Sequence, residues 1–248
     1  MASPTHQFEI KPLVDLQFSG IDLSFTNSSL WMAIAALLSV VFFVSATRKK
    51  AMVPSRVQAM SELSYAFIAN MVRENIGTHG RQYFPLIFTI FMVVFLGNAL
   101  GLIPYSFTYT SHIAVTAALA VMVFLMVIVI GIFKHGMHFF SLFLPPGVPL
   151  WLMPLVIPIE ILSFCIRPVT LSVRLFANMI AGHILLKVIA GFSVGMISMG
   201  AAGYALGILP MLFNVILIGF EFLIAFLQAY VFAILSCIYL KDTVELEH

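Results

Sequence analysis

The sequence predicts an all-α integral membrane protein with a single membrane domain, on three observations. Hydrophobic residues make up 62% of the chain and charged residues only 9%, whereas a soluble domain carries roughly 25% charged residues. Several apolar runs reach the roughly 20 residues that a helix needs to cross about 30 Å of hydrocarbon. No aspartate lies between Asp22 and Asp242. Water is therefore not the main solvent of this chain.

The chain is expected to begin outside the membrane and to cross it first at residues 30–47. Residues 1–29 are polar and lack the apolar stretch of a cleavable secretion signal, so the run that follows is expected to remain as a transmembrane helix. Basic residues flank the cytoplasmic end of a span. Those that follow this run are Arg48, Lys49, Lys50 and Arg56. The N-terminus is therefore predicted outside.

Residues 55–76 are predicted to form an amphipathic helix on the cytoplasmic surface. Ser55 begins a pattern that resembles a capping box, and a glycine, Gly77, follows the segment. Apolar residues then recur at helical spacing, at Val57, Met60, Leu63, Phe67 and Met71. A soluble helix packed on a partner protein is the alternative interpretation.

Two further transmembrane helices are predicted at residues 84–104 and 113–133. Neither run contains a charged residue, and the loop between them contains no Lys or Arg, which places that loop outside. The second run stops at Lys134, a basic end expected in the cytoplasm. His135 and His138 follow and are interpreted as interfacial histidines rather than as metal ligands.

Prolines interrupt the next apolar stretch, so residues 139–153 are predicted to be a re-entrant or interfacial segment. The two runs after it, 159–190 and 211–240, would be roughly 50 Å and 45 Å long as helices. Both exceed the bilayer, so they are predicted to form a strongly tilted antiparallel hairpin. Glycines and Pro210 between them predict a flexible turn outside, which leaves the C-terminus cytoplasmic.

Charged side chains inside the last two runs are the candidate functional residues. They are Glu160, Arg167, Arg174, Lys187 and Glu221. A central Arg or Lys costs about 3 kcal/mol on insertion scales, so such residues normally face partners or water-filled cavities. Arg174 has no acidic residue within ten positions and is expected to need a carboxylate from another chain.

Polar residues fall on distinct faces of the two long helices. At 100° per residue, Arg167, Thr170, Arg174 and Asn178 share one narrow sector, and Glu160 returns to within about 40° of Arg174. His183 lies about half a turn away from Arg174. On the last helix a second stripe repeats every seven residues, at Asn214, Glu221 and Gln228. The pattern predicts two separate polar routes.

Histidine and carboxylate side chains can pass protons one at a time, whereas a guanidinium stays protonated. An arginine would therefore act as a fixed charge. It would favour the ionised form of a carboxylate 4 Å away by about 4 kcal/mol at an effective dielectric constant near 20. The alternative is a purely structural set of internal ion pairs, Glu221 with Lys187 and Glu160 with Arg167.

Several classes of protein are excluded or disfavoured by the sequence. A net charge of +2 is too small for a nucleic-acid partner. Cys165 and Cys237 lie in apolar runs without metal-ligand spacing, and no cofactor or metal is expected. The chain has no nucleotide-binding loop, so ATP chemistry would reside in other subunits, and no aspartate lies at membrane depth for an intramembrane hydrolase with paired aspartates. A proton-coupled secondary transporter remains the alternative function, although no internal repeat is visible.

The segment from Arg167 to His183, RPVTLSVRLFANMIAGH, resembles the signature helix of F-type ATP synthase subunit a. Gly97-Asn98 with Pro104, and Glu221 with Gln228, support the resemblance. It implies a non-catalytic proton-channel subunit with two offset aqueous half-channels. Its partners would be a rotating ring of c subunits, peripheral stalk b subunits, the remaining ATP synthase subunits and the lipid bilayer.

The resemblance also implies roles for individual residues. Arg174 would face the ring and separate the half-channels. The inlet would contain Asn178, His183, Glu221 and Gln228, and the outlet would contain Glu160, Thr170 and Arg167.

Many bacterial relatives place the acid on the arginine helix and the histidine on the last helix, whereas His183 and Glu221 exchange those places. The exchange is similar to alphaproteobacterial and mitochondrial proteins, and a bacterial inner membrane is favoured over the mitochondrial one. Gly101 stands where some members carry an acid, which leaves that part of the inlet unassigned.

Overall fold

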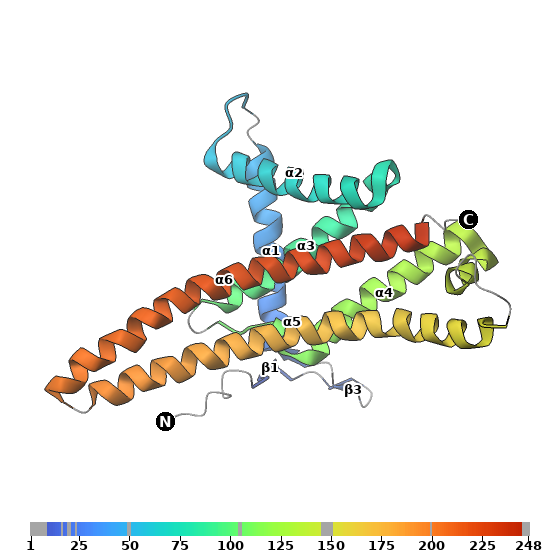
Figure 1. Cartoon of the computed structure of the whole chain (residues 1–248). Coiled ribbons are helices and arrows are strands. Elements are labelled where there is room, and N and C mark those ends of the chain that lie inside the picture. The colour runs from blue at the N-terminus through green and yellow to red at the C-terminus, as the bar shows by residue number, and fades with distance from the viewer. Residues whose placement is uncertain are drawn as a thin grey trace.

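The computed structural model describes residues 9–15, 17–18, 21–22, 24–48, 51–103, 106–144, 151–198 and 200–244. Two short antiparallel strand pairs lie near its N-terminal end. In the first, β1 (Pro12–Val14) pairs with β4 (Phe25–Thr26), and in the second, β2 (Gln17–Phe18) pairs with β3 (Ile21–Asp22). Helices make up most of the remainder of the described chain (Figure 1).

Six α-helices follow the strands. They are α1 (Asn27–Arg48), α2 (Arg56–Ile76), α3 (Phe84–Gly101), α4 (Ile113–His135), α5 (Met153–Ile197) and α6 (Ala201–Val244). Short 3₁₀ segments occur at η2 (Gly77–Tyr83), η3 (Tyr109–Ser111) and η4 (Gly136–Phe143). Within the described residues, five helices are long and apolar enough to cross a membrane, all but α2. The prediction of an all-α integral membrane protein is confirmed.

The helix α2 begins and ends with the local signals that the sequence contains. The Ser55 hydroxyl accepts a hydrogen bond from the backbone N–H of Gln58 at 3.3 Å. Gly77, with φ of 73°, ends the helix and donates its N–H to the carbonyl of Arg73. Ile68, Met71, Val72 and Ile76 of α2 are buried against the chain itself, whereas Val57, Met60 and Leu63 of the predicted apolar face are exposed. The ring of Phe67 lies 6.1 Å from that of Phe91 and 5.8 Å from that of Phe226.

The helices α5 and α6 form a long antiparallel pair that lies across α1 rather than along it (Figure 1). They contain 45 and 44 residues, and so are each about 66 Å long, over twice the hydrocarbon thickness. Pro158, Pro168 and Pro210 lie inside them. Both helices extend beyond the predicted ranges 159–190 and 211–240.

The prediction of a flexible turn between these helices was wrong about the length of the turn. Helix continues on both sides through the glycine-rich stretch, and the described reversal is short, with Gly200 at φ of 93°. One of these glycines, Gly207, instead allows close packing. A Cβ on Gly207 would lie 2.7 Å from Ile197 Cγ1 and 3.2 Å from the Ser193 carbonyl oxygen, so a larger residue would push α5 and α6 apart.

The predicted re-entrant segment, residues 139–153, falls partly on residues 145–150, which lie outside the described residues. Its first residues belong to η4, which folds back on α4, where Phe139 is buried against Gly131. Met153 already belongs to α5. Similarly, α3 ends at Gly101 rather than at position 104.

The core lies where α2, α3, α4, α5 and α6 meet, and includes Ile68, Val94, Val123, Met179 and Phe232. At one end of it, the side chains of Lys134 and His135 contact the carbonyl oxygen of Val244 at 3.1 Å and 3.2 Å. A basic helix end thus meets the last turn of α6, where backbone carbonyls lack helical partners. The ends of α4 and α6 therefore share one side of the molecule.

Candidate functional site

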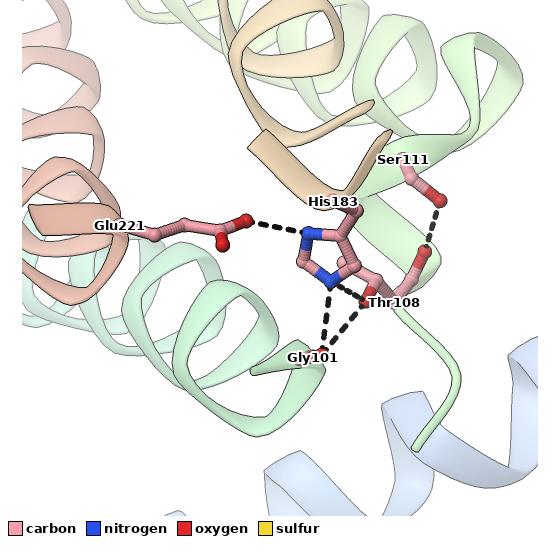
Figure 2. Close-up of polar contacts among 5 residues, drawn as sticks. All are labelled: Gly101, Thr108, Ser111, His183 and Glu221. Atoms are coloured by element: carbon pink, nitrogen blue, oxygen red, sulfur yellow. Dashed lines mark hydrogen bonds and ion pairs between the residues drawn. The ribbon is translucent and has the colours of Figure 1, made fainter. Parts of the chain in front are cut away.

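A buried pair of titratable side chains connects the two long helices. His183 on α5 and Glu221 on α6 meet with His183 Nδ1 only 2.6 Å from Glu221 Oε1 (Figure 2). Their side chains are 9% and 5% exposed. Isolated charges are costly at this depth, so the contact is stabilised because each group is the other's counter-charge or hydrogen-bond partner.

The other imidazole nitrogen determines how the pair can share a proton. His183 Nε2 lies 2.9 Å from the Gly101 carbonyl oxygen and 2.9 Å from Thr108 Oγ1. A carbonyl oxygen only accepts, so Nε2 carries a hydrogen and donates it. Nδ1 therefore either accepts from a protonated Glu221 or donates to the ionised one. A proton can cross this contact without movement of heavy atoms.

The loop before α4 fixes the orientation of the ring. The Thr108 hydroxyl donates to the Gly101 carbonyl at 3.3 Å, and the Ser111 hydroxyl donates to the Thr108 carbonyl at 2.6 Å. Both residues are buried. A Cβ on Gly101 would lie 2.4 Å from Thr108 Oγ1, so glycine permits the loop to approach α3. At Gly101 this chain thus supplies a backbone carbonyl to the histidine.

Two buried oxygen atoms near the pair have no hydrogen-bond partner among the described residues. They are Glu221 Oε2 and Asn214 Oδ1. Both lie on α6, seven residues apart, on the polar stripe that the sequence indicates. Glu221 therefore contacts the histidine through Oε1, and its Oε2 is available to a second proton donor or acceptor.

Gly182 makes room for the carboxylate. A Cβ at this position would lie 2.6 Å from Glu221 Oε1 and 3.0 Å from its Cδ. Gly182→Ala is therefore expected to displace Glu221 and to lower the proton-driven ATP synthesis that the resemblance implies by about tenfold to a hundredfold, since ångström-scale misplacement has such effects. The control is Gly191→Ala on the same helix, where a Cβ meets nothing within 4 Å. Equal synthesis rates in membrane vesicles for both variants would contradict this prediction.

A cavity of about 860 Å³ leads to the histidine. Its polar lining includes His183, Lys187 and Asn214 from the long helices, and Glu9, Lys11 and Asn27 from the N-terminal part of the chain. Asn178 and Gln228, which the resemblance also assigns to the inlet, do not line it. Asn178 is exposed and Gln228 is half-buried.

Arg174 lies on a different surface from the pair. It is exposed, and it makes no hydrogen bond or ion pair with any residue that the structure describes. Thr170 and Asn178 on the same face are also exposed, and Glu160 is half-buried. The half-turn between Arg174 and His183 thus separates an exposed fixed cation from a buried titratable pair.

The internal ion pairs considered as the structural alternative are not those that the structure shows. Arg167 pairs with Asp242, with Nη1 to Oδ2 at 2.9 Å, and its guanidinium stacks 5.1 Å from the Tyr239 ring. Glu221 pairs with His183 rather than with Lys187. Arg167 therefore joins α5 to the end of α6. The position of Arg167 on its helix face does not by itself predict this contact.

Several contributors to the site are not indicated by the sequence reasoning, namely the Gly101 carbonyl, Thr108, Gly182, Asp242 and the N-terminal residues. A backbone carbonyl has no sequence signal, and Thr108 is one of several hydroxyls in its loop. Asn98, noted only in the resemblance, is fully buried and donates from Nδ2 to the Ala225 carbonyl at 3.4 Å.

The fold and the site together define a polytopic membrane protein that carries a buried pair of titratable side chains, His183 and Glu221. A family model described as ATP synthase A chain matches residues 29–241. The chain therefore belongs to the ATP synthase A chain family, which contains the proton-translocating subunit a.

Relatives named ATP synthase subunit a match nearly the whole chain. The Rhizobium leguminosarum bv. trifolii protein is 54% identical over 241 residues, covering 97% of this chain and 96% of the relative. The Rhodospirillum rubrum protein is 53% identical over 246 residues, covering 99% and 100%. The Mesorhizobium japonicum protein is 52% identical over 245 residues, covering 99% and 97%.

These matches confirm the resemblance, including its alphaproteobacterial character. The protein is thus a multi-pass component of a bacterial inner-membrane ATP synthase, and the secondary-transporter alternative is not supported.

Proposed function

We propose that this subunit conducts protons through two offset half-channels, with Arg174 between them and a ring of c subunits completing the route. One observation carries the proposal. The cavity-linked pair His183–Glu221 and the exposed Arg174 lie on opposite surfaces of α5. A proton taken up at the pair cannot pass to the other surface through the guanidinium, because arginine does not give up its proton.

The inlet consists of the cavity and the buried pair. Protons enter from the outer side, reach His183 through the cavity and cross the 2.6 Å contact to Glu221. From its second oxygen, Glu221 passes the proton to a carboxylate of the ring. Asn214, Asn178 and Gln228 provide polar groups along α5 and α6 for the water that carries the proton.

The outlet lies on the polar face of α5 towards the cytoplasm. Glu160 is the titratable group of this face, and Thr170 donates its hydroxyl to the Arg167 carbonyl at 2.9 Å. The pairing of Arg167 with Asp242 suits it to hold the end of α6 against α5 beside the outlet. The basic contacts of α4 with Val244 support a cytoplasmic C-terminus and hence an N-terminus outside.

The c-subunit ring is the partner whose carboxylates would face Arg174. Large apolar side chains surround it on the uncovered face of α5, with Val169 57% and Val173 44% exposed. An exposed cation among apolar side chains is suited to contact a partner helix that presents a single carboxylate on an otherwise apolar surface. The peripheral stalk b subunits would contact other surfaces of the same complex.

Cysteine cross-linking in the assembled complex tests this contact. Thr170→Cys and Asn178→Cys are expected to form disulfides with cysteines on the outer c-subunit helix, because both positions are exposed beside Arg174. Ser172→Cys is the control, since Ser172 is 4% exposed and its hydroxyl lies 3.2 Å from Thr116 Oγ1. Cross-links should also extend over several turns of α6 if this helix is strongly tilted. Cross-links from Ser172→Cys, or from one turn alone, would contradict the arrangement.

A further inference from the structure

We infer that Glu9 and Lys11, held by Asn27, form the outer wall of the inlet cavity and that Glu9 is the carboxylate that collects protons at its mouth. This inference rests on the proposed function, because it assumes that the cavity is the inlet. It assigns a role to a part of the chain in which the sequence shows only a polar stretch.

The segment is fastened to the first transmembrane helix by one residue. Asn27, the first residue of α1, donates its backbone N–H to the Lys11 carbonyl at 3.1 Å and its side-chain N–H to the Glu9 carbonyl at 3.1 Å. Its side-chain oxygen accepts from the Lys11 N–H at 3.2 Å. The pairing of β1 with β4 continues this contact, with Pro12 opposite Thr26. Three hydrogen bonds therefore hold Glu9 and Lys11 in place beside the cavity.

Glu9 and Lys11 line the same cavity as His183. Across it stand Lys187 on α5 and Asn214 on α6, and Trp31 lines it from α1. The cavity is thus bounded by the N-terminal segment and by the helices that carry the proton pair. In the proposed function this cavity opens to the outer side, and Glu9 and Lys11 then lie at its entrance.

The charges around the cavity favour protons over metal cations. Glu9 is the one carboxylate among the described residues that line it, whereas Lys11 and Lys187 both contribute positive charge. Like charges disfavour metal cations in a confined space of low dielectric. A carboxylate can still take a proton from water because the proton binds covalently to its oxygen.

The proposed step balances without a further reactant. A proton from the outer water binds a Glu9 oxygen, is released to water in the cavity and reaches the His183–Glu221 pair. Glu9 then returns to its ionised form, ready for the next proton. Lys11, Lys187 and His183 are the charged or titratable groups facing the cavity together with Glu9.

The test of Glu9 compares two substitutions in the assembled complex. Glu9→Gln keeps the size of the side chain and removes its proton site, and is expected to lower passive proton conductance by about tenfold, less than the full effect of a positioned acid or base because water can partly replace it. Asp15→Asn is the matched control, because Asp15 is an exposed carboxylate of the same segment that does not line the cavity. Equal conductance of the two variants in vesicles stripped of the catalytic subunits would overturn the role of Glu9.

The wall itself is tested by labelling. Ile218 lines the cavity from α6, so Ile218→Cys, in a chain with Cys165 and Cys237 replaced by alanine, reports access from outside. Adding Asn27→Ala is expected to increase the labelling of Ile218→Cys by a membrane-impermeant thiol reagent severalfold, because the wall is then no longer held in place. Unchanged labelling would overturn the assignment of the wall.

The same cysteine separates failure of this inference from failure of the proposed function. If labelling Ile218→Cys does not lower conductance, the cavity is not the inlet and both proposals fail. If labelling blocks conductance while Glu9→Gln behaves like Asp15→Asn, the inlet stands and only the role of Glu9 is lost.

Discussion

Replacing Arg174 with alanine is expected to abolish both ATP-driven proton pumping and proton-driven ATP synthesis. Passive proton conductance should persist or increase, since the fixed charge between the half-channels is lost. A guanidinium holds its charge and spreads its donors over a planar fork, whereas a desolvated ammonium can lose its proton. Arg174→Lys should therefore recover only part of the coupled activity. Pumping and leak are measured on the same membrane vesicles.

The structure predicts that Arg174→Ala still assembles. Arg174 is exposed and has no hydrogen bond or ion pair with the described residues, so its truncation removes no contact that the structure shows within the chain. Arg167→Ala provides the contrast, because it breaks the 2.9 Å pair with Asp242 and the stacking on Tyr239. Immunoblotting should show normal levels of the first variant and reduced levels of the second. Normal synthesis by normally assembled Arg174→Ala would refute the separator mechanism.

Replacing Glu221 with glutamine should have the second largest effect. The amide keeps the shape and can still bond to His183 Nδ1, but it cannot take up and release a proton. Proton-driven synthesis is expected to fall by about a hundredfold, the scale at which a positioned acid or base acts. Passive conductance should fall as well, in contrast to Arg174→Ala. The opposite effects on leak distinguish a relay from a barrier.

Glu74→Gln on α2 is the control for Glu221→Gln. Glu74 is exposed on α2 and is neither in the cavity nor at the pair, so the same chemical change there should leave conductance and synthesis unchanged. Subunit levels of Glu221→Gln should be close to normal, because the bond to His183 is retained in neutral form. Unchanged passive conductance of Glu221→Gln would exclude this carboxylate from the inlet.

The exchange of the histidine and the acid between the two helices, which the resemblance implies, can be understood from the contact of His183 with Glu221. At 2.6 Å the two groups act as one proton-binding unit, so either helix can carry the acid. The orientation is not free in this chain, however. The Gly101 carbonyl accepts from the histidine, and Gly182 leaves space for the carboxylate.

The sequence by itself determines the membrane class, the helices near residues 30–47, 55–76, 84–104 and 113–133, and the angular positions of the polar residues. It does so because apolar run length and the 100° helical repeat are local properties. The half-turn between Arg174 and His183 already places them on different surfaces. The prolines were less informative, since α5 and α6 continue as helices past Pro158, Pro168 and Pro210.

Only the tertiary structure decides which polar groups meet. The contact of His183 with Glu221, the carbonyl of Gly101 at its other nitrogen and the pairing of Arg167 with Asp242 join residues 38 to 82 positions apart. Such contacts depend on how the helices cross and on their relative register, which close packing of side chains sets. The cavity beside Glu9 arises in the same way, because Glu9 and Lys11, held by Asn27, line it together with residues of the two helices that contain the proton pair.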